Sequence, residues 1–150
     1  MNDFLQLSGK RVVVAGLATR RSVATFIAQA LREVGAEVIA TVQGPEQAAA
    51  ARKLLPGAPV YICDVRDEAA LAEQAATIGR EHGPLYGLVH SLAFANFAAT
   101  PQPFHETSRA DFLDAVAVSC HSLVAMARHY KPWFDPDGAI CQDDLVPDDQ

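Results

Sequence analysis

The sequence predicts an α/β fold in which a parallel sheet carries helices on both faces. Short apolar runs rich in β-branched residues alternate along the chain with segments of helical periodicity, and glycine or proline stands at most of the turns between them. Right-handed crossovers between such strands give a doubly wound sheet with the strand order 3-2-1-4. Any fifth strand would lie beyond the fourth.

The composition limits the class of protein. The chain has 150 residues, 50% of them apolar, and a net charge of −6, which suits one soluble domain and argues against a nucleic-acid partner. No long uncharged apolar run predicts a membrane span, and the first residues lack the order of a secretory signal. Neither the three cysteines nor the histidines have metal-ligand spacing. We therefore expect a cytoplasmic protein with reduced thiols and no metal site.

The first strand and helix are the centre of the prediction. Residues Val12 to Val14 form a short buried strand that ends near Gly16, and Ser22 is the expected N-cap of the following helix. The unpaired N–H groups and the dipole of a helix N-terminus favour an anion. This turn is therefore a candidate site for the pyrophosphate of a dinucleotide, although it lacks the pattern G-x-G-x-x-G.

The remaining elements follow from the same signals. Strands are expected over residues 36–42, 60–63 and 86–91, and helices over about 45–55, 67–83 and 110–130. Beyond Ile140 the chain becomes acidic, with four aspartates and one proline over residues 141–150. Because these residue types are poor in a central strand, we predict a domain over 1–140, a sheet truncated before or at strand five, and a disordered tail over 141–150.

Two further segments reach the expected binding edge. Asp64 and Val65 follow the third strand, and His90 and Ser91 end the fourth, so both segments lie at the carboxyl edge that carries Gly16. Ligands of open α/β sheets bind at this edge, near the switch point between strands one and four. The carboxylate of Asp64 can hold an adenine amino group or cap the next helix, and the neighbouring motifs favour adenine. We interpret His90 as a packed histidine rather than an acid–base group.

Several motifs occur in the order and spacing of one enzyme family. They read G-L-A-T-R-R-S-V-A from Gly16, V-Q-G from Val42, C-D-V from Cys63, H-S-L-A-F-A-N from His90, E-T-S-R from Glu106 and V-S-C-H-S-L-V-A-M-A from Val118. In these residues the chain resembles the bacterial enoyl-[acyl-carrier-protein] reductases, a divergent branch of the short-chain dehydrogenase/reductases with a Rossmann-like fold. The resemblance extends from Leu7 to about Ile140.

The resemblance implies a cofactor, its contacts and a substrate. The implied contacts are the pyrophosphate at Gly16, Ser22 and Val23, the adenine ribose at Gln43, the adenine at Asp64 and Val65, and the nicotinamide half at Ser91, Leu92 and Ala93, with Val118 nearby. Ala95 is implied at the entrance of an acyl pocket, and Phe94 and Phe97 are either loop anchors or part of that pocket. The implied reaction is NADH-dependent reduction of a trans-2-enoyl thioester on acyl carrier protein, in an enzyme whose long helix helps to form an oligomer.

The end of the second strand favours NADH over NADPH. It reads V-Q-G-P-E from Val42, without a cation for the 2′-phosphate of NADPH, and Glu46 would repel that phosphate. Arg20 and Arg21, in the loop after the first strand, are the alternative source of a cation.

The catalytic pair of the resembled family is absent from the sequence. In that family a tyrosine is followed by a lysine after six intervening residues, beyond the fifth strand. No tyrosine of this chain has a lysine at that interval, so no catalytic residue is assigned. We expect the chain to bind a dinucleotide without turnover. The alternative is a non-enzymatic module that pairs or oligomerises through the open edge of its sheet.

Overall fold

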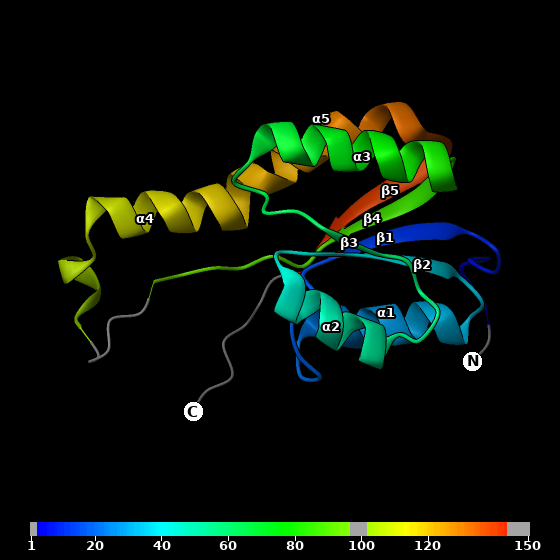
Figure 1. Ribbon diagram of the computed structural model, residues 1–150, viewed down its shortest axis with the longest axis horizontal. Helices are drawn as coiled ribbons and strands as arrows, with labels where there is room; N and C mark the ends of the chain where they lie inside the picture. The colour runs from blue at the N-terminus through cyan, green and yellow to red at the C-terminus, as the bar shows by residue number, and fades with distance from the viewer. Residues whose placement is uncertain (1–2, 97–101, 144–150) are drawn as a thin grey trace.

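The computed structural model describes residues 3–96 and 102–143 and contains a parallel sheet with the order β3-β2-β1-β4-β5 (Figure 1). Its strands are β1 (Arg11–Ala15), β2 (Glu37–Val42), β3 (Val60–Ile62), β4 (Leu85–His90) and β5 (Phe134–Gln142). The helices are α1 (Val23–Glu33), α2 (Pro45–Leu54), α3 (Glu68–His82), α4 (Arg109–Val116) and α5 (Ser122–Tyr130), with short turns η1 (Phe104–Glu106), η2 (Ala117–His121) and η3 (Lys131–Trp133). The predicted α/β class and the order 3-2-1-4 are confirmed.

The sheet separates two apolar cores. Helices α1 and α2 cover one face, and α3 and α5 cover the other (Figure 1). Successive residues of a strand point to opposite faces, so Val12 and Val14 pack toward α1 and α2 while Val13 packs toward α3 and α5. Both faces are therefore apolar along β1, which explains the uninterrupted β-branched run in the sequence.

Helix starts follow the sequence signals at α1, α3 and α4, but at α1 the N-cap side chain makes no capping hydrogen bond. The Asp67 carboxylate accepts a hydrogen bond from the Ala70 N–H at 3.0 Å, and the Ser108 hydroxyl accepts one from the Asp111 N–H at 3.1 Å. Ser22 occupies the N-cap position of α1, but its hydroxyl donates to the Thr19 carbonyl at 2.9 Å. No side chain caps α1, which leaves its N-terminus free of a side-chain acceptor.

The prediction that strand five is aborted is wrong. β5 continues through Cys141 and Gln142, in register with Val89 and His90 of β4. The aspartates on which the prediction was based begin at Asp143, after the last residue of β5. Within the strand, Pro136 lies in the irregular stretch between the pairs Leu85–Phe134 and Gly87–Ala139, and proline is tolerated at such irregularities. The predicted domain boundary at 140/141 thus falls inside β5. Residues 144–150 of the predicted tail lie outside the described residues.

A long helix leaves the sheet and carries exposed apolar side chains. Helix α4, the π-helical turn η2 and α5 form one continuous stretch, and α4 extends beyond the sheet in Figure 1. The stretch Arg109–Trp133 is long and apolar enough to span a membrane by length and composition alone, and 17% of its most apolar window is buried. The sequence contains no uncharged apolar run of that length. The charged residues lie near the two ends of the stretch, however, and the window between them is apolar enough to meet the criterion. Core helices of soluble proteins meet the same criterion, and α5 packs against α3.

Candidate functional site

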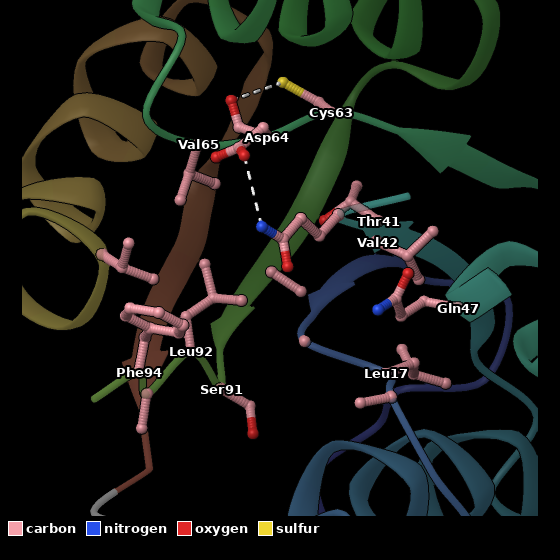
Figure 2. A pocket seen from close by; sticks show the side chains of 16 residues that line it. Leu17, Thr41, Val42, Gln47, Cys63, Asp64, Val65, Ser91, Leu92 and Phe94 are labelled. Atoms are coloured by element: carbon pink, nitrogen blue, oxygen red, sulfur yellow. Dashed lines mark hydrogen bonds between the residues drawn. The ribbon is translucent and has the colours of Figure 1, made fainter. Parts of the chain in front are cut away.

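A cavity of about 150 Å³ opens at the carboxyl edge of the sheet, at the switch point between β1 and β4. In Figure 2, Asp64 and Val65 lie on one side of the cavity, Leu17 on the opposite side, and Ser91, Leu92 and Phe94 along a third. The cavity is lined by Ala15, Gly16, Leu17, Ala18, Thr41, Val42, Gln43, Gln47, Cys63, Asp64, Val65, Ser91, Leu92, Ala93, Phe94 and Val118. Cofactor pockets commonly measure about 300–1,000 Å³, so this cavity would enclose only part of a dinucleotide.

Most of the predicted cofactor residues converge on this cavity. The eight that line it are Gly16, Gln43, Asp64, Val65, Ser91, Leu92, Ala93 and Val118. Ser22 and Val23 do not line it and lie at the N-terminus of α1. Ala95, the predicted entrance of an acyl pocket, is exposed and also lies outside the cavity. Phe94 lines the cavity, and Phe97 lies outside the described residues.

Gly16 allows the two central strands to approach each other at the cavity. Its φ angle is +99°, and a Cβ atom at this position would lie 1.8 Å from the Ser91 carbonyl oxygen. The Ser91 N–H donates to the Ala15 carbonyl at 3.2 Å, and the Gly16 N–H donates to the Thr41 carbonyl at 3.2 Å. Glycine is therefore required here both for its positive φ and for the close approach of the chain after β4.

A charged network closes the end of the cavity next to β2 and β3. The Asp64 carboxylate accepts hydrogen bonds from the Arg66 guanidinium at 2.6–3.2 Å and from the Gln43 side-chain amide at 3.2 Å. The hydrogen bonds from Arg66 are the main reason that the pKa of Asp64 lies well below its usual range. Arg66 also lies 3.7 Å from an Asp114 carboxylate oxygen and 5.9 Å from the centre of the Phe94 ring. It thus joins the loop after β3 to α4 and to the loop after β4.

Cys63 lies beside this network at the end of β3. Burial, reinforced by the negative charges of Asp67 and Asp64, raises the pKa of its thiol to about 11. Its Sγ lies 3.5 Å from the Asp64 carbonyl oxygen, a contact drawn in Figure 2. The thiol is therefore protonated near neutral pH and contributes a small apolar surface to the cavity.

Two serines of the long helix hold the chain that follows β4. The Ser119 hydroxyl accepts a hydrogen bond from the Phe94 N–H at 3.0 Å and lies 3.3 Å from the Phe94 carbonyl. Ser122 lies 2.7 Å from Nε2 of the fully buried His90. Between them, Val118 of the η2 turn lines the cavity. The π-helical turn therefore positions one wall of the cavity, as such turns often do at functional sites.

The two arginines of the loop after β1 do not enter the cavity. Neither Arg20 nor Arg21 lines it, and both are exposed. Arg20 instead lines a separate groove between α1 and α2, together with Lys53 and Phe26. The alternative source of a cation for a 2′-phosphate, left open by the sequence, thus does not line the cavity.

Several residues of the site are missed by sequence reasoning. The contact between Arg66 and Asp64 could have been predicted, because a cation two positions after a carboxylate can fold back onto it. Ser119 and Ser122 lie on a helix face that reads as ordinary helix, and nothing in the local pattern predicts the η2 turn. Asp143, which accepts a hydrogen bond from Ser91 at 2.7 Å, belongs to the segment predicted as disordered.

Comparisons with known proteins identify the family of the chain. The family model described as enoyl-(acyl carrier protein) reductase matches residues 16–143. The enoyl-[acyl-carrier-protein] reductase [NADH] of Enterococcus faecalis is 35% identical over 89% of this chain and 54% of its own length. The corresponding reductase [NADPH] of Staphylococcus aureus is 33% identical over 91% of this chain and 55% of its own length.

Solved structures of enoyl-acyl carrier protein reductases also match the chain. The crystal structure of the Bacillus cereus enoyl-acyl carrier protein reductase with NADP+ and indole naphthyridinone superposes with a TM-score of 0.84 at 38% identity, over 91% of this chain and 55% of that one. The NADH reductase of Aquifex aeolicus has a TM-score of 0.85 at 30% identity, over 91% and 56%. The chain spans about half the length of the relatives it matches. With the family model matching 16–143 and the motifs gathered at one cavity, the chain belongs to the enoyl-(acyl carrier protein) reductase family.

Proposed function

We propose that the chain binds a nicotinamide dinucleotide across the carboxyl edge of its sheet. The observation that carries this proposal is the convergence of eight predicted cofactor residues on one cavity at the switch point. The N-terminus of α1 supports it, because no side chain caps that helix and its first-turn N–H groups suit a pyrophosphate. Ser22 and Val23 would meet the pyrophosphate there, outside the cavity itself.

The two halves of the dinucleotide have different neighbours in this proposal. The adenosine half lies over the ends of β2 and β3, and the nicotinamide half lies over β1, β4 and the residues from Ser91 to Ala93. Arg66 and Gln43 already occupy the Asp64 carboxylate. Binding therefore has Gln43 leave Asp64 for the adenine ribose, so that the adenine amino group takes its place as a donor to Asp64 Oδ2, which Arg66 continues to contact. The exchanged bond is exposed and 3.2 Å long, so the exchange costs little.

A fluorescence titration with NADH tests this proposal directly. We expect saturable binding, with quenching of the Trp133 emission or enhancement of the dihydronicotinamide emission. The matched variant is Asp64→Asn, which keeps the shape of the side chain but loses the charge that holds Arg66, and we expect its affinity for NADH to fall. A sample that is folded by circular dichroism and yet binds no NADH would overturn the proposal.

We infer that NADH is preferred to NADPH. The end of β2 carries no lysine or arginine between residues 42 and 47, and the exposed Glu46 lies in the first turn of α2. Arg20 lines the groove between α1 and α2 instead. We expect NADH to bind about fivefold more tightly than NADPH, since one repulsive charge near a phosphate is worth about 1 kcal/mol.

Charge reversal at Glu46 tests the preference. Glu46→Lys should strengthen NADPH binding, so that the dissociation constant for NADPH approaches or falls below that for NADH. The control Glu33→Lys makes the same change of charge at the exposed last residue of α1 and should leave the ratio unchanged. Equal affinities for the two cofactors in the unchanged chain would contradict the inference.

The substrate of the whole family is a separate proposal. We propose that the parent reaction is reduction of an enoyl thioester on acyl carrier protein, and that residues 1–150 alone bind the cofactor without turnover, since they contain no tyrosine and lysine at the family's interval. The three cysteines are free thiols, which suits the cytoplasm. NADH oxidation measured with crotonyl thioester should equal the rate without protein, and measurable turnover would refute this part.

A second candidate function is pairing through the sheet edge. β5 is the edge strand of the sheet among the described residues, most of its side chains are exposed, and Ile140 is 40% exposed. An open edge of this kind offers N–H and C=O groups to another strand. Size-exclusion chromatography with light scattering should then detect a dimer, whereas a monomer at every soluble concentration would argue against self-pairing.

A further inference from the structure

The strand β5 places a carboxylate beside the cavity. Asp143 is the first residue after β5, and Ser91 is the first residue after the neighbouring strand β4. The Ser91 hydroxyl donates a hydrogen bond to Asp143 Oδ2 at 2.7 Å, and the Asp143 N–H donates to the His90 carbonyl at 3.3 Å. Ser91 itself lines the cavity. The Asp143 carboxylate is therefore held one side chain away from the space that the cavity offers.

The charge of this carboxylate is not neutralised by its surroundings. No ion pair within residues 3–96 and 102–143 includes Asp143, and its Oδ1 is buried without a hydrogen-bond partner among those residues. The neighbouring imidazole of His90 is fully buried, and this burial lowers its pKa, so it remains neutral near pH 7. The described residues thus place no positively charged side chain in an ion pair with the carboxylate at the β4–β5 side of the cavity.

We propose that Asp143 makes the cavity favour the oxidised over the reduced form of the nicotinamide. The inference rests on the proposed function, which places the nicotinamide half over β1 and β4. The oxidised ring carries a positive charge, and the reduced ring carries none. A carboxylate several ångströms away attracts the charged ring and has no such attraction for the neutral one.

The size of the effect follows from Coulomb's law. For opposite charges about 7 Å apart and an effective dielectric constant of about 40, between the values for a protein surface and for water, the attraction corresponds to a roughly five- to tenfold difference in affinity. The carboxylate also opposes the pyrophosphate of both forms equally, so that repulsion cancels in the ratio of the two affinities. The ratio of the dissociation constants for NAD+ and NADH is therefore the quantity to measure.

The experiment is isothermal titration calorimetry of the whole chain with NAD+ and with NADH. Asp143→Asn removes the charge and keeps an acceptor for the Ser91 hydroxyl, and we expect it to shift the ratio about five- to tenfold toward NADH. Asp137→Asn is the control, because it makes the same change in net charge at an exposed position in the first half of β5, away from Asp143. This control should leave the ratio within about twofold of that of the unchanged chain.

Added salt provides a second measurement that needs no variant. Because salt screens charges that are partly exposed to water, the preference of the unchanged chain for NAD+ should weaken between low salt and about 1 M salt. If Asp143→Asn leaves the ratio of the dissociation constants for NAD+ and NADH unchanged, the inference is overturned while cofactor binding stands. If that variant fails to fold, a ratio that does not change with salt in the unchanged chain overturns the inference in the same way. Failure of the folded chain to bind either nucleotide overturns the proposed function and this inference with it.

Discussion

Replacing Gly16 by alanine tests whether the contact between β1 and the chain after β4 shapes the cavity. The added Cβ would lie 1.8 Å from the Ser91 carbonyl oxygen, whereas such contacts are essentially never shorter than 3.0 Å, so that oxygen must retreat by about 1.2 Å. The retreat stretches the hydrogen bond from the Ser91 N–H to the Ala15 carbonyl, which already measures 3.2 Å. The same substitution forces an L-residue into a φ of +99°.

These effects give the expected loss of stability. The positive φ costs about 1–2 kcal/mol, the lost backbone hydrogen bond about 1 kcal/mol, and the steric displacement about 1–3 kcal/mol. We expect Gly16→Ala to lower the free energy of unfolding by about 3–6 kcal/mol, a large part of the 5–15 kcal/mol typical of a domain. Gly57→Ala is the matched control, since Gly57 has a φ of +81° but nothing within 4 Å of its Cβ position.

The assay has two readouts. Urea unfolding followed by circular dichroism should show that Gly16→Ala is at least about 2 kcal/mol less stable than Gly57→Ala, because only the former adds the clash. NADH titration under folding conditions should show weakened binding in Gly16→Ala and unchanged binding in Gly57→Ala. If the two variants lose the same stability and bind NADH equally, the close approach at Ser91 does not shape the cavity, and the argument is refuted.

Two further predictions concern ionisation at the cavity. Arg66→Met should raise the pKa of Asp64 toward its ordinary value of about 3.9, as measured by NMR titration, because the hydrogen bonds that lower it are lost. In the unchanged chain the paired Asp64 carboxylate stabilises the fold above pH about 4, and this stabilisation is lost as the pH falls through the lowered pKa. Arg66→Met should abolish this dependence of the free energy of unfolding on pH. At pH 8, iodoacetamide should alkylate Cys63 more slowly than the exposed Cys120 and Cys141, as followed by peptide mass spectrometry, since its pKa is raised to about 11. Equal rates at the three thiols would contradict the burial of Cys63.

Local patterns were sufficient for the half of the fold that contains β1, β2 and β3. The uninterrupted run from Val12 to Val14 predicted a strand buried on both faces, and both faces carry a core. Asp67 and Pro45 marked helix starts that the structure confirms, because capping and the fixed φ of proline act within a few residues. Asp64 was placed at the cavity from sequence, since parallel strands bring their carboxyl ends to one edge. Gln43 was placed near it only by the family resemblance, and the structure joins the two side chains by a hydrogen bond of 3.2 Å.

The half that contains β4, β5 and the long helix depends on contacts distant in sequence. β5 was rejected on the aspartates and the proline after Ile140, but Cys141 and Gln142 pair with β4 before the first of those aspartates, Asp143. The hydrogen bonds from Ser91 to Asp143 and from Phe94 to Ser119 join residues 52 and 25 positions apart. No local pattern encodes such a pair. A resemblance to the family placed Ser91 and Val118 near one another but gave no partner for either.

The histidine at the end of β4 illustrates how this second half is held. The Ser122 hydroxyl has one hydrogen, and it donates that hydrogen to the Val118 carbonyl at 2.5 Å. The contact of 2.7 Å to His90 must then run the other way, with Nε2–H donating to the Ser122 oxygen, so the neutral imidazole is the Nε2–H tautomer. Because burial lowers the pKa of His90, this tautomer persists at neutral pH and ties β4 to the η2 turn. The position of Val118 in the cavity is thus fixed by a buried polar contact, whereas Gln43 and Asp64 are placed by the ends of their strands alone.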